Sequence, residues 1–192
     1  MCFCFRYVEG EGGGKLVDFV PRAAFAQMRR MPDLYFMLAD FYLKNKDWNK
    51  SGRFYLLDSV VNPVRVDSWA GNALARTGAL ETKLNSCQPI KQDRTVFDKT
   101  SAALRCFHRT LSLDKKNVKM WIEYGSVSYM MHSHASRQMK QDSSVDMRME
   151  MMAYLEKEKE SLLAKAKHCF DTASKLVTAA AKRKAKKQGS QL

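Results

Sequence analysis

The hydrophobic positions of this chain recur at the spacing of helices, and aromatic residues mark where related segments begin. Tyr35, Trp69 and Trp121 each open a stretch in which apolar residues return every three or four positions, the pattern of an amphipathic helix. This spacing predicts helices over 22–31, 34–45, 48–60, 67–79, 98–113 and 118–131. Strong helix formers without Gly or Pro fill 147–187, so we expect one long helix there.

The first two of these aromatic residues are separated by 34 residues, which is the period of the tetratricopeptide (TPR) repeat. Such a repeat is a pair of antiparallel helices with small and aromatic residues at fixed places. The chain fills those places with Tyr35, Tyr42, Tyr55, Pro63, Trp69, Ala103, Phe107, Trp121, Gly125, Ala166, Phe170 and Ala173. Because the second and third repeats are longer than a plain TPR, we place insertions at 80–97 and 132–147 and expect the first to be a loop.

These patterns predict an all-α fold, a TPR-like α-solenoid of about three helix pairs with two insertions and a long C-terminal helix. We divide the chain into a poorly determined N-terminal segment (1–32), a TPR-like domain (33–178) and a basic tail (179–192). The alternative is an ordinary helical bundle whose aromatic residues only fill the core.

Composition agrees with a helical repeat domain, since 45% of the 192 residues are apolar and 28% are charged. No apolar run approaches the roughly 20 residues that cross a bilayer, so we expect no membrane partner. The five cysteines are odd in number and scattered, which favours a reducing compartment, the cytosol or the nucleus.

The net charge of +13 is partly concentrated near the C-terminus. The basic cluster consists of Lys182, Arg183, Lys184, Lys186 and Lys187. We interpret it as a nuclear-import signal, with a solvated helix end that complements the helix dipole as the alternative. Direct nucleic-acid binding is not expected, because the aromatic residues occupy repeat positions and do not alternate with the basic ones.

Catalytic or metal-binding patterns are weak. Cys2 and Cys4 have no second cysteine pair at zinc spacing, and His132 and His134 have no neighbouring carboxylate or thiol. The histidines do not pair with a nucleophile in a recognisable pattern, and no phosphate-binding loop is present. We therefore expect a non-enzyme without a cofactor or a metal.

A TPR array presents its first helices to a concave groove. The side chains that point into it are predicted to be Phe36, Asp40, Leu43, Ala70, Leu74, Thr77, Ile122, Ser126 and Tyr129. This mostly apolar set suits an apolar segment or an amphipathic helix of a partner protein. Alternatively, the neighbouring repeats of the chain itself fill the groove.

Six stretches resemble the TPR region of the Cabin family of calcineurin-binding proteins, in the same order and with the same insertions. They are residues 38–46 (LADFYLKNK), 67–76 (DSWAGNALAR), 83–86 (KLNS), 121–126 (WIEYGS), 132–138 (HSHASRQ) and 166–170 (AKHCF). The resemblance covers roughly 33–174 and stops beyond Ser174, so we expect a fragment or a short form of a longer protein.

The resemblance implies a nuclear scaffold subunit of the HIRA histone-chaperone complex, which assembles nucleosomes independently of replication and regulates transcription. Its expected partners are the other histone-chaperone subunits, with calcineurin as a further partner. Calcineurin docking in the family lies outside the repeats, and no docking segment of that type is present here. The alternatives are a signalling adaptor that binds or inhibits calcineurin, a generic TPR co-chaperone, and a piece that does not fold alone.

Overall fold

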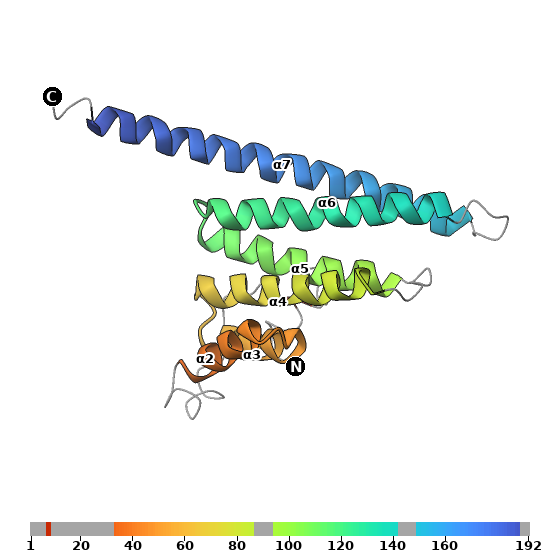
Figure 1. The fold of residues 1–192 in the computed structure, drawn as a ribbon, viewed down its shortest axis with the longest axis horizontal. Coiled ribbons are helices and arrows are strands. Elements are labelled where there is room, and N and C mark those ends of the chain that lie inside the picture. The colour runs from red at the N-terminus through yellow and green to blue at the C-terminus, as the bar shows by residue number, and fades with distance from the viewer. Residues whose placement is uncertain (1–6, 9–32, 87–93, 142–148, 189–192) are drawn as a thin grey trace. The chain divides into compact units, whose positions relative to one another are not determined.

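The computed structural model describes residues 7–8, 33–86, 94–141 and 149–188, and their regular structure is entirely α-helical (Figure 1). The helices are α2 (Leu34–Lys44), α3 (Trp48–Val61), α4 (Val66–Leu84), α5 (Arg94–Leu113), α6 (Val118–Gln141) and α7 (Met149–Gln188). The predicted all-α class and long C-terminal helix are confirmed. The helix predicted over 22–31 and the rest of 1–32, apart from residues 7–8, lie outside the described residues.

The chain forms two compact units, residues 1–115 and 116–192. In the first unit α3 packs on α2, α4 on α3 and α5 on α4, and α2 also contacts α4. In the second unit α6 and α7 pack against each other, and Figure 1 shows them side by side along most of α6. In chain order we group the described helices as three consecutive pairs, α2/α3, α4/α5 and α6/α7, and the first helix of each begins within one residue of its predicted start.

The turn between α2 and α3 is defined by side-chain hydrogen bonds and one left-handed residue. Lys46 has φ 59°, which ends α2, and the Asn45 amide donates to the Phe41 carbonyl at 2.8 Å. The Asp47 carboxylate then accepts from the Lys50 backbone N–H at 3.2 Å and caps α3. Asp47 is therefore the cap that makes this tight helix pair possible.

Small residues bring α2, α3 and α4 close together. The Ser51 hydroxyl donates to the Ala39 carbonyl at 3.0 Å across α2 and α3. Tyr55 of α3 is 2% exposed and its ring lies directly against Gly71 of α4. The fully buried Trp69 donates its indole N–H to the Pro63 carbonyl at 2.9 Å. These contacts join α3 to α4, because a side chain at Gly71 would occupy the place of the Tyr55 ring.

A buried carboxylate fixes the corner between α3 and α4. Asp58 is fully buried and accepts hydrogen bonds from Ser68 in the first turn of α4 and from Asn62 at 3.2 Å. Arg65 approaches Asp58 at 3.5 Å and Asp33 at 2.5 Å. Asp33 stands at the start of α2 but makes no capping hydrogen bond, so its carboxylate pairs with Arg65 instead.

The loop predicted over 80–97 is wrong at both ends. The α4 helix continues to Leu84 and α5 begins at Arg94, and residues 87–93 lie outside the described part. The reason is apolar burial, since Leu80, Val96 and Phe97 are each at most 3% exposed and hold both helix ends in the core.

The first helix of the third pair is also longer than predicted, because α6 runs through the second insertion to Gln141. Buried positions of α6 and α7 repeat at seven, four, three and four residues, the period of a coiled-coil seam. They are Met120, Val127, Met131, His134 and Gln138 on α6, and Leu155, Leu162, Ala166, Cys169 and Ala173 on α7. His134 and Gln138 are polar residues at inward positions, so the seam is not visible as an apolar stripe.

Two residues near the N-terminus belong to the core of the first unit. Val8 is fully buried and its carbonyl accepts from Arg105 Nε at 2.7 Å. The Tyr7 hydroxyl donates to the Arg105 carbonyl at 3.2 Å, and its ring meets the edge of Trp69 at a centroid distance of 6.0 Å. Burial raises the pKa of Tyr7. These two residues are packed on α4 and α5 rather than loosely tied.

Candidate protein-binding surfaces

The TPR signature positions of the first unit lie at helix contacts. Tyr35 and Tyr42 both stack on Phe54, at centroid distances of 6.5 and 5.5 Å. Ala103 and Phe107 of α5 are fully buried. Tyr55 and Trp69 are buried as well, whereas Tyr35, Tyr42 and Pro63 are half-buried.

In the second unit the same signature is only partly covered. Ala166 and Ala173 are buried, and Trp121 meets the edge of His168 at 5.8 Å. Phe170 lies over Gly125 but remains 40% exposed, whereas Tyr55 at the equivalent position of α3 is 2% exposed under α4. The Phe170 ring is therefore only partly covered, because α6 contacts one part of it and the rest is exposed.

The predicted groove residues of α2 and α4 are mostly half-buried. Phe36 makes a T-shaped contact with Tyr55 at 6.0 Å and lies under the Arg65 guanidinium at 5.3 Å. Asp40 pairs with Lys44 at 2.7 Å, and Leu43, Ala70 and Leu74 are half-buried. Thr77 is 6% exposed and its hydroxyl donates to the Ala73 carbonyl, so it offers little to a partner.

The predicted groove residues of α6 are open. Ile122 is 44% and Tyr129 54% exposed, and Ser126 between them is exposed as well. The Tyr129 ring stacks on His132 at 5.9 Å, which holds it in one orientation. Residues at this spacing share one side of a helix, so α6 presents an apolar strip with a hydroxyl at its centre.

Met37 and Phe41 of α2 were not predicted as surface residues from the sequence. Both are large apolar side chains, with exposed fractions of 57% and 59%. They lie one turn apart beside the predicted groove positions, and Phe41 packs edge-on against Tyr42 at 5.4 Å. Their spacing of four residues could have indicated from the sequence that both lie on one side of α2. Together they widen the apolar surface of α2.

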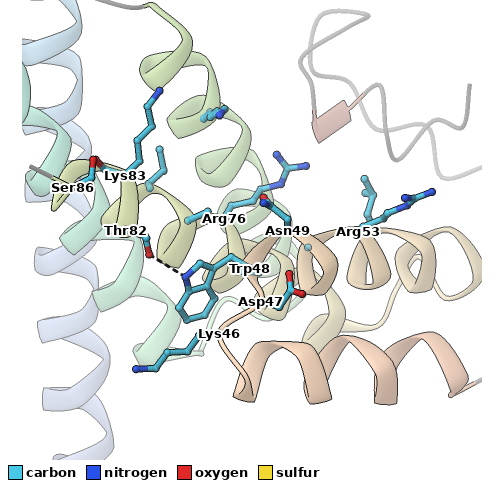
Figure 2. A pocket seen from close by; sticks show the side chains of 15 residues that line it. Lys46, Asp47, Trp48, Asn49, Arg53, Arg76, Thr82, Lys83 and Ser86 are labelled. Atoms are coloured by element: carbon cyan, nitrogen blue, oxygen red, sulfur yellow. Dashed lines mark hydrogen bonds between the residues drawn. The ribbon is translucent and has the colours of Figure 1, made fainter. Parts of the chain in front are cut away.

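A basic cleft between α3, α4 and α5 is a second surface that the sequence did not reveal. It has a volume of about 850 Å³ and is partly open to solvent. Five cationic side chains line it, namely Lys46, Arg53, Arg76, Lys83 and Lys99. Figure 2 shows the Trp48 indole pointing across the cleft toward Thr82, to which it donates a hydrogen bond at 3.1 Å.

Three titratable side chains of the second unit are at least partly buried or hydrogen-bonded, namely His132, His134 and Cys169. Burial raises the pKa of the Cys169 thiol to about 11, so it is not a thiolate at neutral pH. Burial, with Arg137 nearby, lowers the pKa of His134, and His132 Nδ1 lies 3.1 Å from the Lys159 carbonyl. No group of three potential metal ligands occurs among the described residues, while Cys2 and Cys4 lie outside them.

The predicted basic cluster lies on the last turns of α7, which continues to Gln188. Lys182 and Arg183 are exposed there. Among the residues that the structure describes, no helix is long and apolar enough to span a membrane. No model of a known protein family matches the chain, and no solved structure matches it.

Proposed function

We propose that this protein is a non-enzymatic protein-interaction scaffold whose helix pairs form a TPR-like solenoid. The observation that carries the proposal is the coincidence of signature residues with helix contacts. Tyr35 and Tyr42 stack on Phe54 within the first pair, Tyr55 packs on Gly71 of the next pair, and Phe170 packs on Gly125 within the third. An ordinary bundle has no reason to place small and aromatic residues at these recurring positions.

The surface that would bind partners is the first-helix side of each pair. The strip of Ile122, Ser126 and Tyr129 on α6 is exposed, and Met37 and Phe41 extend the corresponding side of α2. Exposed apolar side chains in helical register suit the apolar face of a partner helix. The buried thiols and the hydrogen-bonded histidine support an interaction role rather than a catalytic one.

The cellular setting rests on the resemblance to the Cabin family. We propose that the chain acts in the nucleus, in a chromatin-assembly complex of the HIRA type, through contacts with the other histone-chaperone subunits. The exposed Lys182 and Arg183 on α7 are accessible to an import receptor, which fits this location. Nuclear accumulation lost on deletion of 182–187 would support the import signal, and unchanged accumulation would remove it.

The test is affinity purification of the full 192-residue chain from nuclear extract, followed by mass spectrometry. The groove variant carries Ile122→Glu and Tyr129→Glu. Its matched control carries Leu163→Glu and Val177→Glu on α7, where the side chains are 46% and 53% exposed against 44% and 54% in the groove. Both variants add the same charge to equally exposed sites of the same unit.

We expect the wild type and the α7 control to recover histone-chaperone subunits and the α6 variant to lose them. Equal recovery by all three proteins would show that this strip of α6 is not the binding surface. Recovery of calcineurin without chaperone subunits would favour a signalling adaptor. Recovery of folding chaperones alone would contradict the scaffold proposal.

A further inference from the structure

The basic cleft lies on the side of α4 opposite to the predicted groove. On α4, the groove residues Ala70 and Leu74 lie about half a turn around the helix axis from the cleft residues Arg76 and Lys83. The remaining walls come from the second helices of the first two pairs, α3 and α5. A ligand of this cleft would therefore not compete with one on the groove side.

Most of the cationic side chains in the cleft have no ion-pair partner among the described residues. Among the described residues, no carboxylate forms an ion pair, with a nitrogen–oxygen distance of 4.0 Å or less, with Lys46, Arg53, Lys83 or Lys99. The one acidic residue in the lining, Asp47, is paired with Lys50 at 2.9 Å. Like charges gathered in a concave site raise the local positive potential and attract anions.

Apolar and small residues form part of the cleft lining. Leu56 and Leu80 are at most 3% exposed, and Gly52, Ala75 and Ala79 complete the lining between the helices. The Trp48 ring rests on Gly78, where an added Cβ would approach it to 2.8 Å, and its indole N–H is held by Thr82. A cleft with cations on the rim and an aliphatic floor favours ligands that carry both negative charge and an apolar group.

We propose that this cleft binds an acidic peptide segment of a partner protein, with aspartate or glutamate side chains on the cationic rim and an apolar side chain on the floor. The volume of about 850 Å³ lies within the range of ligand sites. A single-stranded nucleic acid fits less well, because sites for single strands combine cations with aromatic faces on which the bases stack. Trp48 is the one aromatic residue in the lining, and its ring already packs on Gly78.

This inference rests on the proposed interaction function and names the chemistry of one partner, but its test is independent of any complex. A fluorescent synthetic peptide with a central leucine pair flanked by aspartates and glutamates is titrated with the purified full chain, and anisotropy is recorded. The same peptide with asparagine and glutamine in place of the acids and a labelled single-stranded oligonucleotide serve as comparison ligands.

Two variants separate charge from shape. The rim variant is Arg53→Glu with Lys83→Glu, and its control is Lys157→Glu with Lys175→Glu on exposed positions of α7, which changes the net charge equally. The second variant, Gly52→Leu, blocks the floor without altering charge. A Cβ at Gly52 meets no atom closer than 3.8 Å and Gly52 lines the cleft, so we expect a leucine there to reduce the cleft volume, and circular dichroism checks that the variant remains folded.

We expect saturable binding of the acidic peptide, weakened about tenfold by the rim variant and by Gly52→Leu, and unchanged within about twofold by the control. No binding by the wild type overturns the proposal, as does an equal loss in the control, which would indicate general charge attraction. Preference for the oligonucleotide with the same dependence on the rim overturns it in favour of nucleic acid. Either result leaves the co-purification test unaffected, so the two proposals fail separately.

Discussion

Replacing Gly71 by alanine tests how α3 and α4 are packed. The same substitution at an ordinary helical glycine stabilises the helix by up to about 1 kcal/mol, because alanine loses less backbone entropy. At Gly71 the new Cβ would lie 2.5 Å from Tyr55 Cε1 and closer still to Cζ. Tyr55 is 2% exposed and its ring also meets Phe36 at 6.0 Å, so it has no free space to move into.

Overpacking of this kind costs typically about 1–3 kcal/mol. Since it outweighs the helix-propensity gain, we expect Gly71→Ala to lower the free energy of unfolding of the first unit by about 1–2 kcal/mol. Gly52→Ala is the matched control, because the nearest atoms to its Cβ are 3.8 and 3.9 Å away. That variant should be more stable than the wild type by about 0.5–1 kcal/mol.

The assay is urea unfolding followed by tryptophan fluorescence in a Trp121→Phe background, so that emission comes from Trp48 and Trp69 of the first unit. In a Tyr55→Leu background the penalty of Gly71→Ala should fall by about 1 kcal/mol or more, since the ring that it meets is gone. A stabilising Gly71→Ala, or a penalty that persists without Tyr55, would refute the contact as the cause.

Three further predictions concern buried polar and titratable groups. Because burial lowers the pKa of His134, aided by Arg137, the second unit should lose stability as pH falls below about 6.5, and His134→Gln should flatten the pH dependence of its urea midpoint. The Cys169 thiol, with its pKa raised to about 11, should be alkylated about a hundredfold more slowly at pH 8 in the folded protein than in urea, measured by peptide mass spectrometry. Asp58→Ala should cost about 3 kcal/mol in urea unfolding because it leaves Ser68 without its buried acceptor, and a cost below about 1 kcal/mol would contradict this.

The sequence predicted the helices well wherever apolar residues recur at helical spacing. It identified five of the six described helices to within a few residues at their starts, because positions such as Tyr35, Trp69 and Trp121 head uninterrupted apolar patterns. The start of α5 was missed by four residues, since Arg94 and Thr95 look like part of a polar insertion. Val96 and Phe97 are what hold that first turn in the core.

The extension of α6 was missed for a different reason. His134 and Gln138 continue the inward-facing seam, but their side chains are polar and hide its period. Each is only 7% exposed against α7, where Leu155 and Leu162 supply the apolar part of the contact. Only the partner helix reveals which side of α6 is inside, and that pairing is not local in sequence.

The two candidate surfaces also differ in how much of each could be predicted from the sequence. That Ile122 and Tyr129 share one side of α6 follows from counting positions along the helix, whereas their exposure was not predicted from the sequence. The cleft depends on how α3, α4 and α5 meet, so Arg53 and Lys83 gave no signal beyond being basic. Residues on one helix face can be grouped from sequence, whereas a site shared by three helices requires the packing angle between them.

The packing of α4 explains how one helix contributes to both surfaces. Gly71 and Gly78 have no side chains where Tyr55 and Trp48 cross α4, so α3 lies close along this helix, and parts of α4 that neither α3 nor α5 covers contribute to both surfaces. One side carries the half-buried Leu74, and the opposite side forms a wall of the cleft. A charge introduced at either surface should therefore leave the other intact, whereas a larger residue at Gly71 should weaken both by displacing α3. That difference separates loss of binding at a surface from loss of the fold that supports it.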